Sequence, residues 1–220
     1  EVKKKVLKNV SRYLTTLDYN LSTPDAARFI YRIIRKETGI KDPYKNIKKK
    51  YNRLALGIYS KVKKFIDSST NPLLYGIKIS IGANIIDFGT GHKFDFKEII
   101  NVLKEPLAIN NYKSFLNTLM KSKNILFLGD NAGEILFDRI LIEEIRKIKN
   151  NIEIFYAVKG TPVINDATVE DAQEVGIDRI AKIISNGCDA PGTLLHSVNK
   201  SFKKIYNSSD LIISKGQGNY

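Results

Sequence analysis

The sequence predicts an α/β protein in which a mostly helical N-terminal region, residues 1–120, precedes a body with a mainly parallel sheet, residues 121–220. Two patterns lead to this prediction. Helix starts marked by proline recur in the first region, and short apolar runs alternate with helical patterns in the second. Because such alternation is typical of parallel strands joined by right-handed crossovers, we expect a Rossmann-like body with three layers, α/β/α.

The N-terminal region contains several helix signals. Apolar residues at helical intervals predict a first helix within residues 1–20. Three capping residues stand directly before a proline and predict three further helix starts: Thr23-Pro24, Asp42-Pro43 and Asn71-Pro72. The last of these helices is expected to continue through Ile86. A capping box at Asp95 predicts a helix toward Leu103, and residues 111–121 form another helical pattern.

The body shows a regular order of strand, loop and helix. Strands are predicted at residues 125–128, 152–158, 179–185 and 210–214. Helices are predicted between them at residues 135–149, 169–175 and 193–206. The carboxyl ends of parallel strands meet at one edge of the sheet, where open α/β folds bind ligands. Polar, glycine-containing sequences follow all four strands, namely GDNAGE, KGTPVINDAT, NGCDAPGT and KGQGN.

Composition limits the possible classes of protein. The net charge of +13 is concentrated in residues 1–70, which carry 18 Lys and Arg against 6 Asp and Glu. A basic face can bind nucleic acid or steer anionic substrates, but solvated helix surfaces are the preferred explanation of the charge. The single cysteine, Cys188, excludes an internal disulfide and a cysteine-rich zinc site and fits a reducing cytoplasm. No apolar run approaches the roughly 20 residues of a membrane helix. From the first and last residues we expect both ends to be truncated.

Two loops at the predicted sheet edge offer oxygen ligands for a cation. Asp130 and Asn131 follow the first strand, and Asp166 follows the second, with Asn165 beside it. Carboxylate and amide oxygens are ligands that Mg²⁺ or Mn²⁺ accepts. The alternative is that Asp130 and Asp166 cap the helices that follow them. Because polar loops follow four successive strands, a binding site is the better interpretation.

The fourth loop has the composition of an anion site. Lys215 is followed by Gly216, Gln217, Gly218 and Asn219. Glycines let backbone N–H groups approach an anion closely, as a phosphate cradle requires. Taken alone, the same sequence is equally compatible with a plain turn. The steps Lys159-Gly160 and Asn186-Gly187 are weaker signals of the same kind.

Other polar residues have weaker assignments. Glu134 is a candidate general acid/base or outer group, or simply a first-turn glutamate favoured by the helix dipole. Asn84 and Asp87, three residues apart among apolar neighbours, are candidates for the border of the site, although a local capping role explains them as well. His92 and His196 are isolated and predicted to be structural or surface residues.

Four segments together resemble a known family: DNAGE at 130–134, NDAT at 165–168, KGQGN at 215–219 and GANIIDFG at 82–89. They are similar to the damage-control phosphatases, long catalogued as domain of unknown function eighty-nine, and to the archaeal and bacterial branch in particular. The resemblance implies a metal-dependent phosphatase of small phosphorylated metabolites. The paired cysteines and the further strands usual in that branch are absent here, which leaves substrate choice open.

The resemblance also implies roles for individual residues. Asp130, Asn131 and Asp166 would bind a divalent cation such as Mg, Mn, Co or Ni. Lys215 and the backbone of residues 216–219 would hold the phosphate. Glu134 would join them in catalysis, and Asn84, Asp87 and Asn165 would border the site.

The leading functional hypothesis is therefore cytoplasmic hydrolysis of phosphomonoesters such as sugar phosphates. An S-adenosylmethionine-dependent methyltransferase is the alternative, but LGDNAG lacks the G-x-G-x-x-G spacing and Lys159 replaces the acidic ribose-binding residue. A non-catalytic nucleic-acid binder using residues 1–70 ranks third, because that region lacks a recognisable binding signature. No membrane partner is expected, and the oligomeric state and the physiological substrate are left open.

Overall fold

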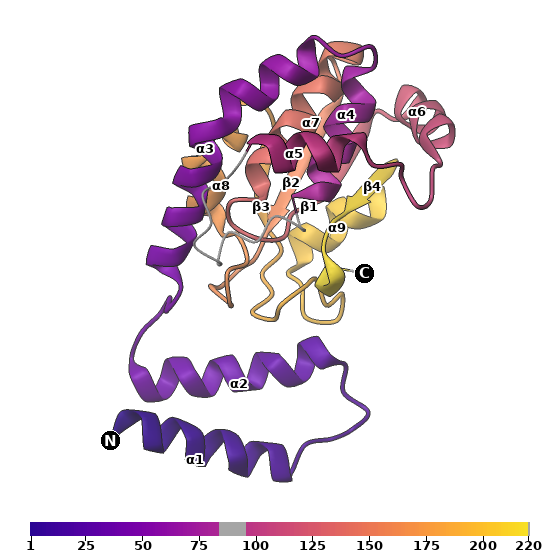
Figure 1. The fold of residues 1–220 in the computed structure, drawn as a ribbon. Coiled ribbons are helices and arrows are strands. Elements are labelled where there is room, and N and C mark those ends of the chain that lie inside the picture. Colours follow the sequence, from indigo (N-terminus) through magenta and orange to yellow (C-terminus); the bar gives the residue numbers. More distant parts are fainter. Residues whose placement is uncertain (84–95, 220) are drawn as a thin grey trace.

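The computed structural model describes residues 1–83 and 96–219 and confirms the predicted α/β fold (Figure 1). Four parallel strands form one sheet in the order β3-β2-β1-β4. The strands are β1 (Asn124–Leu128), β2 (Glu153–Val158), β3 (Lys182–Ser185) and β4 (Leu211–Ser214). β1 lies in the interior of the sheet, and its last four residues are buried, as its apolar sequence predicts. All four carboxyl ends therefore face the same edge.

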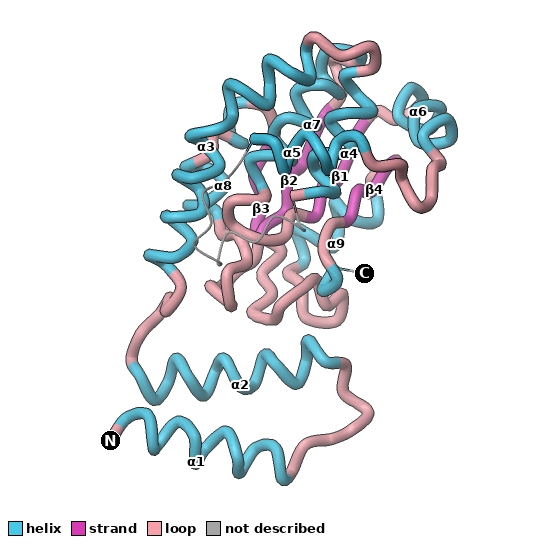
Figure 2. Tube along the Cα trace, in the orientation of Figure 1, coloured by secondary structure: helices cyan, strands magenta, loops and turns pink. Residues whose placement is uncertain are grey.

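Figure 2 shows how helices surround this small sheet. The N-terminal helices are α1 (Val2–Thr15), α2 (Thr23–Thr38), α3 (Lys45–Asp67), α4 (Pro72–Gly82), α5 (Phe96–Lys104) and α6 (Tyr112–Lys121). The body contains α7 (Ile135–Ile148), α8 (Val169–Glu174) and α9 (Lys200–Ser208). Two short 3₁₀ helices, η1 (Ile177–Arg179) and η2 (Gln217–Asn219), complete the described chain.

Side chains of the sheet alternate between two hydrophobic cores. Phe127 and Tyr156 point to the larger core, where α3, α4, α7 and α8 pack. Leu126 and Leu128 point to a smaller core closed by Phe202 of α9. Strand side chains alternate between the two faces of a sheet, so apolar residues at every position require helices on both sides. This arrangement accounts for the three layers that the sequence predicts.

The structure confirms one of the three helix starts that were predicted from a capping residue before proline, and it corrects the other two. Asn71 caps α4 as predicted, because its side chain accepts a hydrogen bond from the Leu74 N–H at 3.2 Å. At α2 the cap is Ser22, one residue earlier than predicted, and Thr23 is already helical. The prediction for Asp42 is wrong: its carboxylate accepts from the Tyr44 N–H at 3.0 Å, and this local turn delays α3.

Two boundaries in the body also differ from the prediction. The predicted helix at residue 193 begins only at Lys200. Its N-cap is Asn199, whose side chain accepts from the Phe202 N–H at 2.7 Å, whereas Thr193 donates to Asn219 Oδ1 at 2.7 Å. The predicted strand at residue 179 begins at Lys182, because the 3₁₀ helix η1 occupies the residues before it. The contact of Thr193 with Asn219 joins two loops that are distant in sequence, so residue patterns do not contain it.

Helices α1 and α2 form a hairpin that lies across from the carboxyl edge of the sheet (Figure 1). The hairpin contacts the body through polar groups of α2. Arg28 and Arg32 bind Asp189 of the loop after β3, and Asp25 binds His196 at 3.0 Å. His196 therefore has a structural partner, as its predicted structural role implies. The hairpin is placed by ion pairs to the loops that follow the strands.

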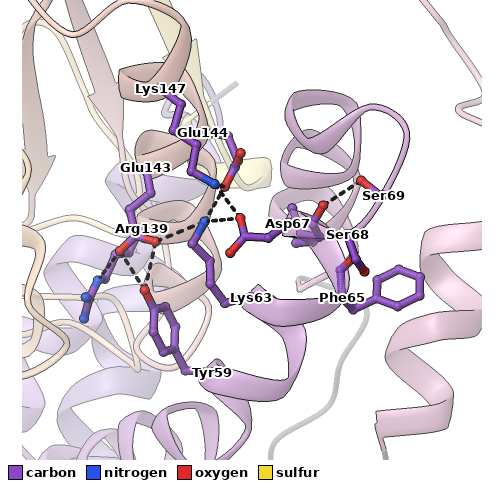
Figure 3. A network of polar contacts seen from close by, with 11 residues as sticks. Tyr59, Lys63, Phe65, Asp67, Ser68, Ser69, Arg139, Glu143, Glu144 and Lys147 are labelled. Atoms are coloured by element: carbon purple, nitrogen blue, oxygen red, sulfur yellow. Dashed lines mark hydrogen bonds and ion pairs between the residues drawn. The ribbon is translucent and has the colours of Figure 1, made fainter.

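Helix α7, which starts at the candidate site, is fixed against α3 by the ion-pair network in Figure 3. Lys63 of α3 binds Glu144 of α7, and Lys147 of α7 lies 3.0 Å from the same carboxylate. Tyr59 donates a hydrogen bond of 2.8 Å to Glu143. Glu144 is 1% exposed, so its charge requires these partners. The network ties the N-terminal helices to the helix that follows the site.

Within residues 1–83 and 96–219, the structure contains no helix with the length and hydrophobicity that a membrane crossing requires. The predictions for Asn84, Ile86, Asp87, His92 and Asp95 lie outside the described residues. The division of the chain at residue 120 stays a prediction, since α4 and α7 pack together across it.

Candidate functional site

The turn after β1 is shaped by two glycines. A side chain at Gly129 would lie 2.5 Å from the Tyr156 hydroxyl, and Gly133 has a φ of 86°. The chain can therefore turn from β1 directly into α7, whose N-cap is Glu134. Asp130 and Asn131 stand between these points, at the carboxyl end of the strand.

A short antiparallel bridge joins this turn to the loop after β2. Residues Asn131 and Asp166 pair across it. The Ala132 N–H donates to the Asn165 carbonyl at 2.9 Å, and the Ala167 N–H donates to the Asp130 carbonyl at 2.8 Å. These bonds place the two loops side by side, so the structure brings Asp130, Asn131 and Asp166 together.

The three side chains border a pocket of about 290 Å³ at the sheet edge. The residues lining the pocket are Asp130, Asn131, Ile164, Asn165, Asp166, Pro191, Gly192, Gln217 and Gly218. The alternative role of Asp130 and Asp166 as helix caps does not agree with the structure. Glu134 occupies the N-cap position of α7 without a capping hydrogen bond from its side chain, and Thr168 forms a capping box with Asp171 at the start of α8.

Hydrogen bonds orient the Asn131 amide. Its Nδ2 donates to Asp130 Oδ2 at 3.0 Å and to Glu134 Oε1 at 2.9 Å. Both donors of the amide are thus used by carboxylates, and no described residue donates to Oδ1. The side chain presents an oxygen, the atom that a hard cation requires.

The negative charges of the carboxylates at the site are only partly balanced by neighbouring positive charges and hydrogen bonds. Burial raises the pKa of Asp166 to about 6, although Lys159 opposes the shift. Burial also raises the pKa of Asp130 above its ordinary value and that of Glu134 to about 7. Asp166 Oδ2 is buried without a hydrogen-bond partner among the described residues, and Lys159 Nζ lies 3.5 Å away. A carboxylate in this state is stabilised by an additional cation.

The charges near the pocket agree with a divalent cation. Four carboxylates, of Asp130, Glu134, Asp138 and Asp166, stand against the two ammonium groups of Lys159 and Lys215. When all are ionised, two negative charges remain. Within residues 1–83 and 96–219, no group of three or more His, Cys, Asp or Glu side chains has the arrangement of a metal site. The oxygens at the pocket that could hold a cation are those of two carboxylates and the Asn131 amide, and oxygen ligands of this kind suit Mg²⁺ or Mn²⁺ better than a soft metal.

Lys215 lies below the pocket in a buried polar cluster. Its Nζ is 2.9 Å from Asp138 Oδ1 and 3.7 Å from Glu134 Oε2. Burial alone would lower the pKa of Lys215, but Asp138 and Glu134 outweigh this effect and raise it. Lys215 therefore carries its charge at neutral pH. Its predicted contact with phosphate stays a prediction, and the structure adds its pairing with Asp138.

The KGQGN loop is held tightly against the turn after β1. A side chain at Gly216, whose φ is 78°, would lie 2.0 Å from Asp130 Oδ2. The Asn219 side chain donates to the carbonyls of Gly129 and Lys215 at 3.0 and 2.8 Å. Asn219 thus fastens the loop to the turn, and the glycine leaves room for the carboxylate of Asp130.

Two polar residues of this region are absent from the sequence-based site. Asp138 is fully buried and accepts hydrogen bonds from Ser80 and Tyr156, at 2.7 and 2.6 Å. Lys159 is 2% exposed and donates to Asn219 Oδ1 at 3.1 Å. The only sequence signal for Lys159 is its position at the end of a strand before glycine. For Asp138, the only feature of the sequence that could have identified it is that it is a charged residue in an otherwise apolar part of a helix.

Comparisons with known proteins identify the family to which the chain belongs. The sequence model of the damage-control phosphatase ARMT1-like domain matches residues 1–220. An uncharacterized protein from Methanocaldococcus jannaschii is 43% identical over 199 residues, covering 87% of this chain and 64% of its own length. A damage-control phosphatase from Pyrococcus horikoshii is 36% identical over 197 residues, covering 89% of this chain and 67% of its own length.

The fold is also found in a solved structure. The crystal structure of a DUF89 family protein from Pyrococcus horikoshii superposes with a TM-score of 0.90 at 33% identity, over 99% of this chain and 76% of that one. The chain spans about two thirds of the length of the curated relatives named above. With its full length matched by the family model and its fold shared with a solved member, the chain belongs to the damage-control phosphatase ARMT1-like family.

Proposed function

We propose that the chain is part of a metal-dependent phosphatase that hydrolyses small phosphorylated metabolites such as sugar phosphates. The observation that carries this proposal is the bridge between the loops after β1 and β2, which brings two carboxylates and an oriented amide oxygen to one pocket. The name of the Pyrococcus horikoshii relative, a damage-control phosphatase, supports the reaction class. The cytoplasmic location expected from the single cysteine stays a prediction.

Asp130, Asn131 and Asp166 would hold the divalent cation. Such a cation, when bound, neutralises charge on a phosphate oxygen and lowers the pKa of a bound water. Lys159 and Lys215 pair with Asp166 and Asp138 and so offset part of the negative charge at this edge of the sheet. With the cation's two charges added, the four carboxylates would be balanced, and a phosphate oxygen could then enter the pocket as a ligand of the cation.

Glu134 is the candidate proton carrier of the reaction. Burial raises the pKa of its carboxyl group to about 7, with Lys215 and Asn131 opposing the shift. A group with this pKa both accepts and donates a proton readily near neutral pH. Its Oε1 accepts from the Asn131 amide, which fixes the direction of the carboxyl group. Glu134 would therefore take a proton from water or give one to the departing alkoxide.

The sequence-based alternative of a methyltransferase is weaker on structural grounds. Lys159, at the end of β2, is buried against Asp166 and occupies the position where a ribose-binding carboxylate would be needed. Family membership favours the phosphatase as well.

The test uses the full-length protein, stripped with EDTA and then supplied with Mg²⁺, Mn²⁺, Co²⁺ or Ni²⁺. Release of inorganic phosphate is measured on a panel of sugar phosphates. We expect turnover that requires metal and falls by about 100-fold or more in Asp130→Ala, because electrostatic stabilisation of the reacting group is lost.

Asp178→Ala is the matched control, since Asp178 is exposed in η1. Its activity should equal that of the wild type. Equal turnover by the wild type and Asp130→Ala, or full activity in EDTA, would contradict the proposal.

A further inference from the structure

One face of α2 carries three arginines that converge on a single carboxylate. Arg28, Arg32 and Arg35 are spaced at i, i+4 and i+7, which places them along one side of the helix. All three bind Asp189 in the loop after β3. We call these three residues the α2 arginine face.

The contacts leave much of the donor capacity unused. Arg32 donates through Nε to Asp189 Oδ2 at 2.6 Å and through Nη2 to Oδ1 at 3.1 Å. Arg28 adds a bond to Ser197 Oγ at 2.7 Å, and Arg35 adds one to the Pro162 carbonyl at 3.0 Å. Each guanidinium has five N–H groups, so most of these donors have no partner among the described residues.

The charges are also unbalanced. Three guanidinium groups face one carboxylate, which leaves two positive charges at the α2 arginine face. The Asp25 carboxylate on the same helix is already occupied by His196 at 3.0 Å. The Arg32 side chain is 45% exposed, so a ligand can reach it without unfolding the hairpin.

The α2 arginine face borders the candidate site. Asp189 comes two residues before Pro191, and Pro162, which Arg35 binds, comes two residues before Ile164. Pro191 and Ile164 both line the 290 Å³ pocket. Figure 1 shows α2 across from these loops, on the side to which the carboxyl ends of the strands point.

We propose that the α2 arginine face binds a second phosphate group of the substrate, while the first phosphate lies in the pocket, where the cation that Asp130 and Asp166 would hold balances its charge. Guanidinium forks pair with phosphate oxygens through two parallel hydrogen bonds, and Arg32 has the exposure to form them. This inference rests on the proposed phosphatase function. It identifies the preferred substrates as bisphosphorylated metabolites.

The competing explanation is that the arginines only fasten α2 to the body. The two explanations differ in one measurable quantity, the preference for a bisphosphate over a monophosphate. A fastening role affects both ligands equally, because neither depends on a particular arginine contact. A phosphate-binding role affects only the ligand that carries the second phosphate.

The experiment compares fructose 1,6-bisphosphate with fructose 1-phosphate in the full-length protein. Their kcat/KM values are measured with the metal that supports turnover. Their dissociation constants are measured by calorimetry with Ca²⁺, which takes the same oxygen ligands, under conditions where no hydrolysis is detected. In the wild type we expect the bisphosphate to be preferred by about tenfold or more in both measurements, as one charge-assisted contact provides. In Arg32→Gln the preference should fall below about threefold, and Arg32→Lys should keep an intermediate value.

Arg12→Gln is the matched control, because Arg12 is an exposed arginine on α1. It should leave the preference unchanged. Equal binding of both sugars by the wild type would overturn the inference, as would an Arg32→Gln variant that weakens both equally. If neither sugar is hydrolysed, the proposed function fails, and the calorimetric comparison alone decides whether the second phosphate site exists.

Discussion

Asp138 connects α7 to three partners in the interior below the pocket. Its Oδ1 accepts from Ser80 and pairs with Lys215 at 2.9 Å, and its Oδ2 accepts from Tyr156 at 2.6 Å. A fully buried carboxylate is tolerated only when hydrogen bonds and an opposite charge replace its lost water. The cluster thus holds the ammonium group of Lys215 3.7 Å from Glu134 Oε2.

Replacing Tyr156 by Phe tests the contribution of this cluster. The ring is fully buried and should keep its packing on Phe127, while Asp138 loses one of its three partners. We expect the free energy of unfolding to fall by about 1–3 kcal/mol, the usual cost of an unsatisfied buried polar group. Urea unfolding followed by circular dichroism measures the change.

The matched control is Tyr19→Phe, because Tyr19 is 92% exposed. It should leave the free energy of unfolding unchanged. A loss below about 0.5 kcal/mol in Tyr156→Phe would mean that the cluster reorganises around another partner.

Among the secondary-structure elements, the α1–α2 hairpin depends most clearly on a single carboxylate. Burial alone would raise the pKa of Asp189, but hydrogen bonds from Arg32 and Arg28 outweigh it and hold the pKa below the ordinary value of 3.8. A carboxyl group with a lowered folded pKa stabilises the folded state above its unfolded pKa. That stabilisation is lost as the pH falls through the folded pKa.

The Asp189→Asn variant should therefore show a pH-dependent defect. We expect its free energy of unfolding to lie below that of the wild type by a constant amount above about pH 5, where the unfolded carboxyl group is ionised. The difference should shrink steadily below about pH 4, where the wild-type carboxyl group takes up its proton. Urea unfolding of both proteins from acid to neutral pH measures it, and a difference independent of pH would contradict the ion-pair assignment.

The elements also show what residue patterns can and cannot predict. The four strands were predictable because each is a short apolar run bounded by polar residues, and the parallel order followed from the helices between them. The start of α9 predicted at residue 193 was wrong, because Thr193 instead donates to Asn219, a residue that it approaches only in the folded chain. The Asn71 cap was predictable because its hydrogen bond is local.

At the scale of the whole molecule, some residues of the candidate site could be predicted from the order of strands and loops, and others depend on contacts between residues that are distant in sequence. Asp130, Asn131 and Asp166 were identifiable because loops after parallel strands share an edge, a consequence of topology alone. Asp138 and the α2 arginine face were not, because their partners are distant in sequence: Asp138 meets Ser80 from 58 residues away, and Arg28 meets Asp189 from 161 residues away. The sequence shows that these residues are charged, but it does not show which residues they contact in the folded chain.

Metal binding should couple the site to the stability of the entire chain. Asp130, Asn131 and Asp166 are assembled only when the loops after β1 and β2 pair, so the unfolded chain lacks the site. A ligand at 100 times its dissociation constant stabilises a protein that binds it only when folded by about 2.7 kcal/mol. For a chain of this size, we expect Mn²⁺ at that concentration to raise the Tm by roughly 5–10 °C, at about 2–4 °C per kcal/mol.

Calorimetric scans with EDTA and with Mn²⁺ measure this shift directly. Asp166→Asn should lose most of it, because the amide keeps the size of the side chain but removes its negative charge. Asp178→Asn, an exposed substitution of the same chemistry, should retain the full shift. A Tm that does not respond to metal in the wild type, or an equal response in Asp166→Asn, would mean that the two loops form a polar contact without holding a cation.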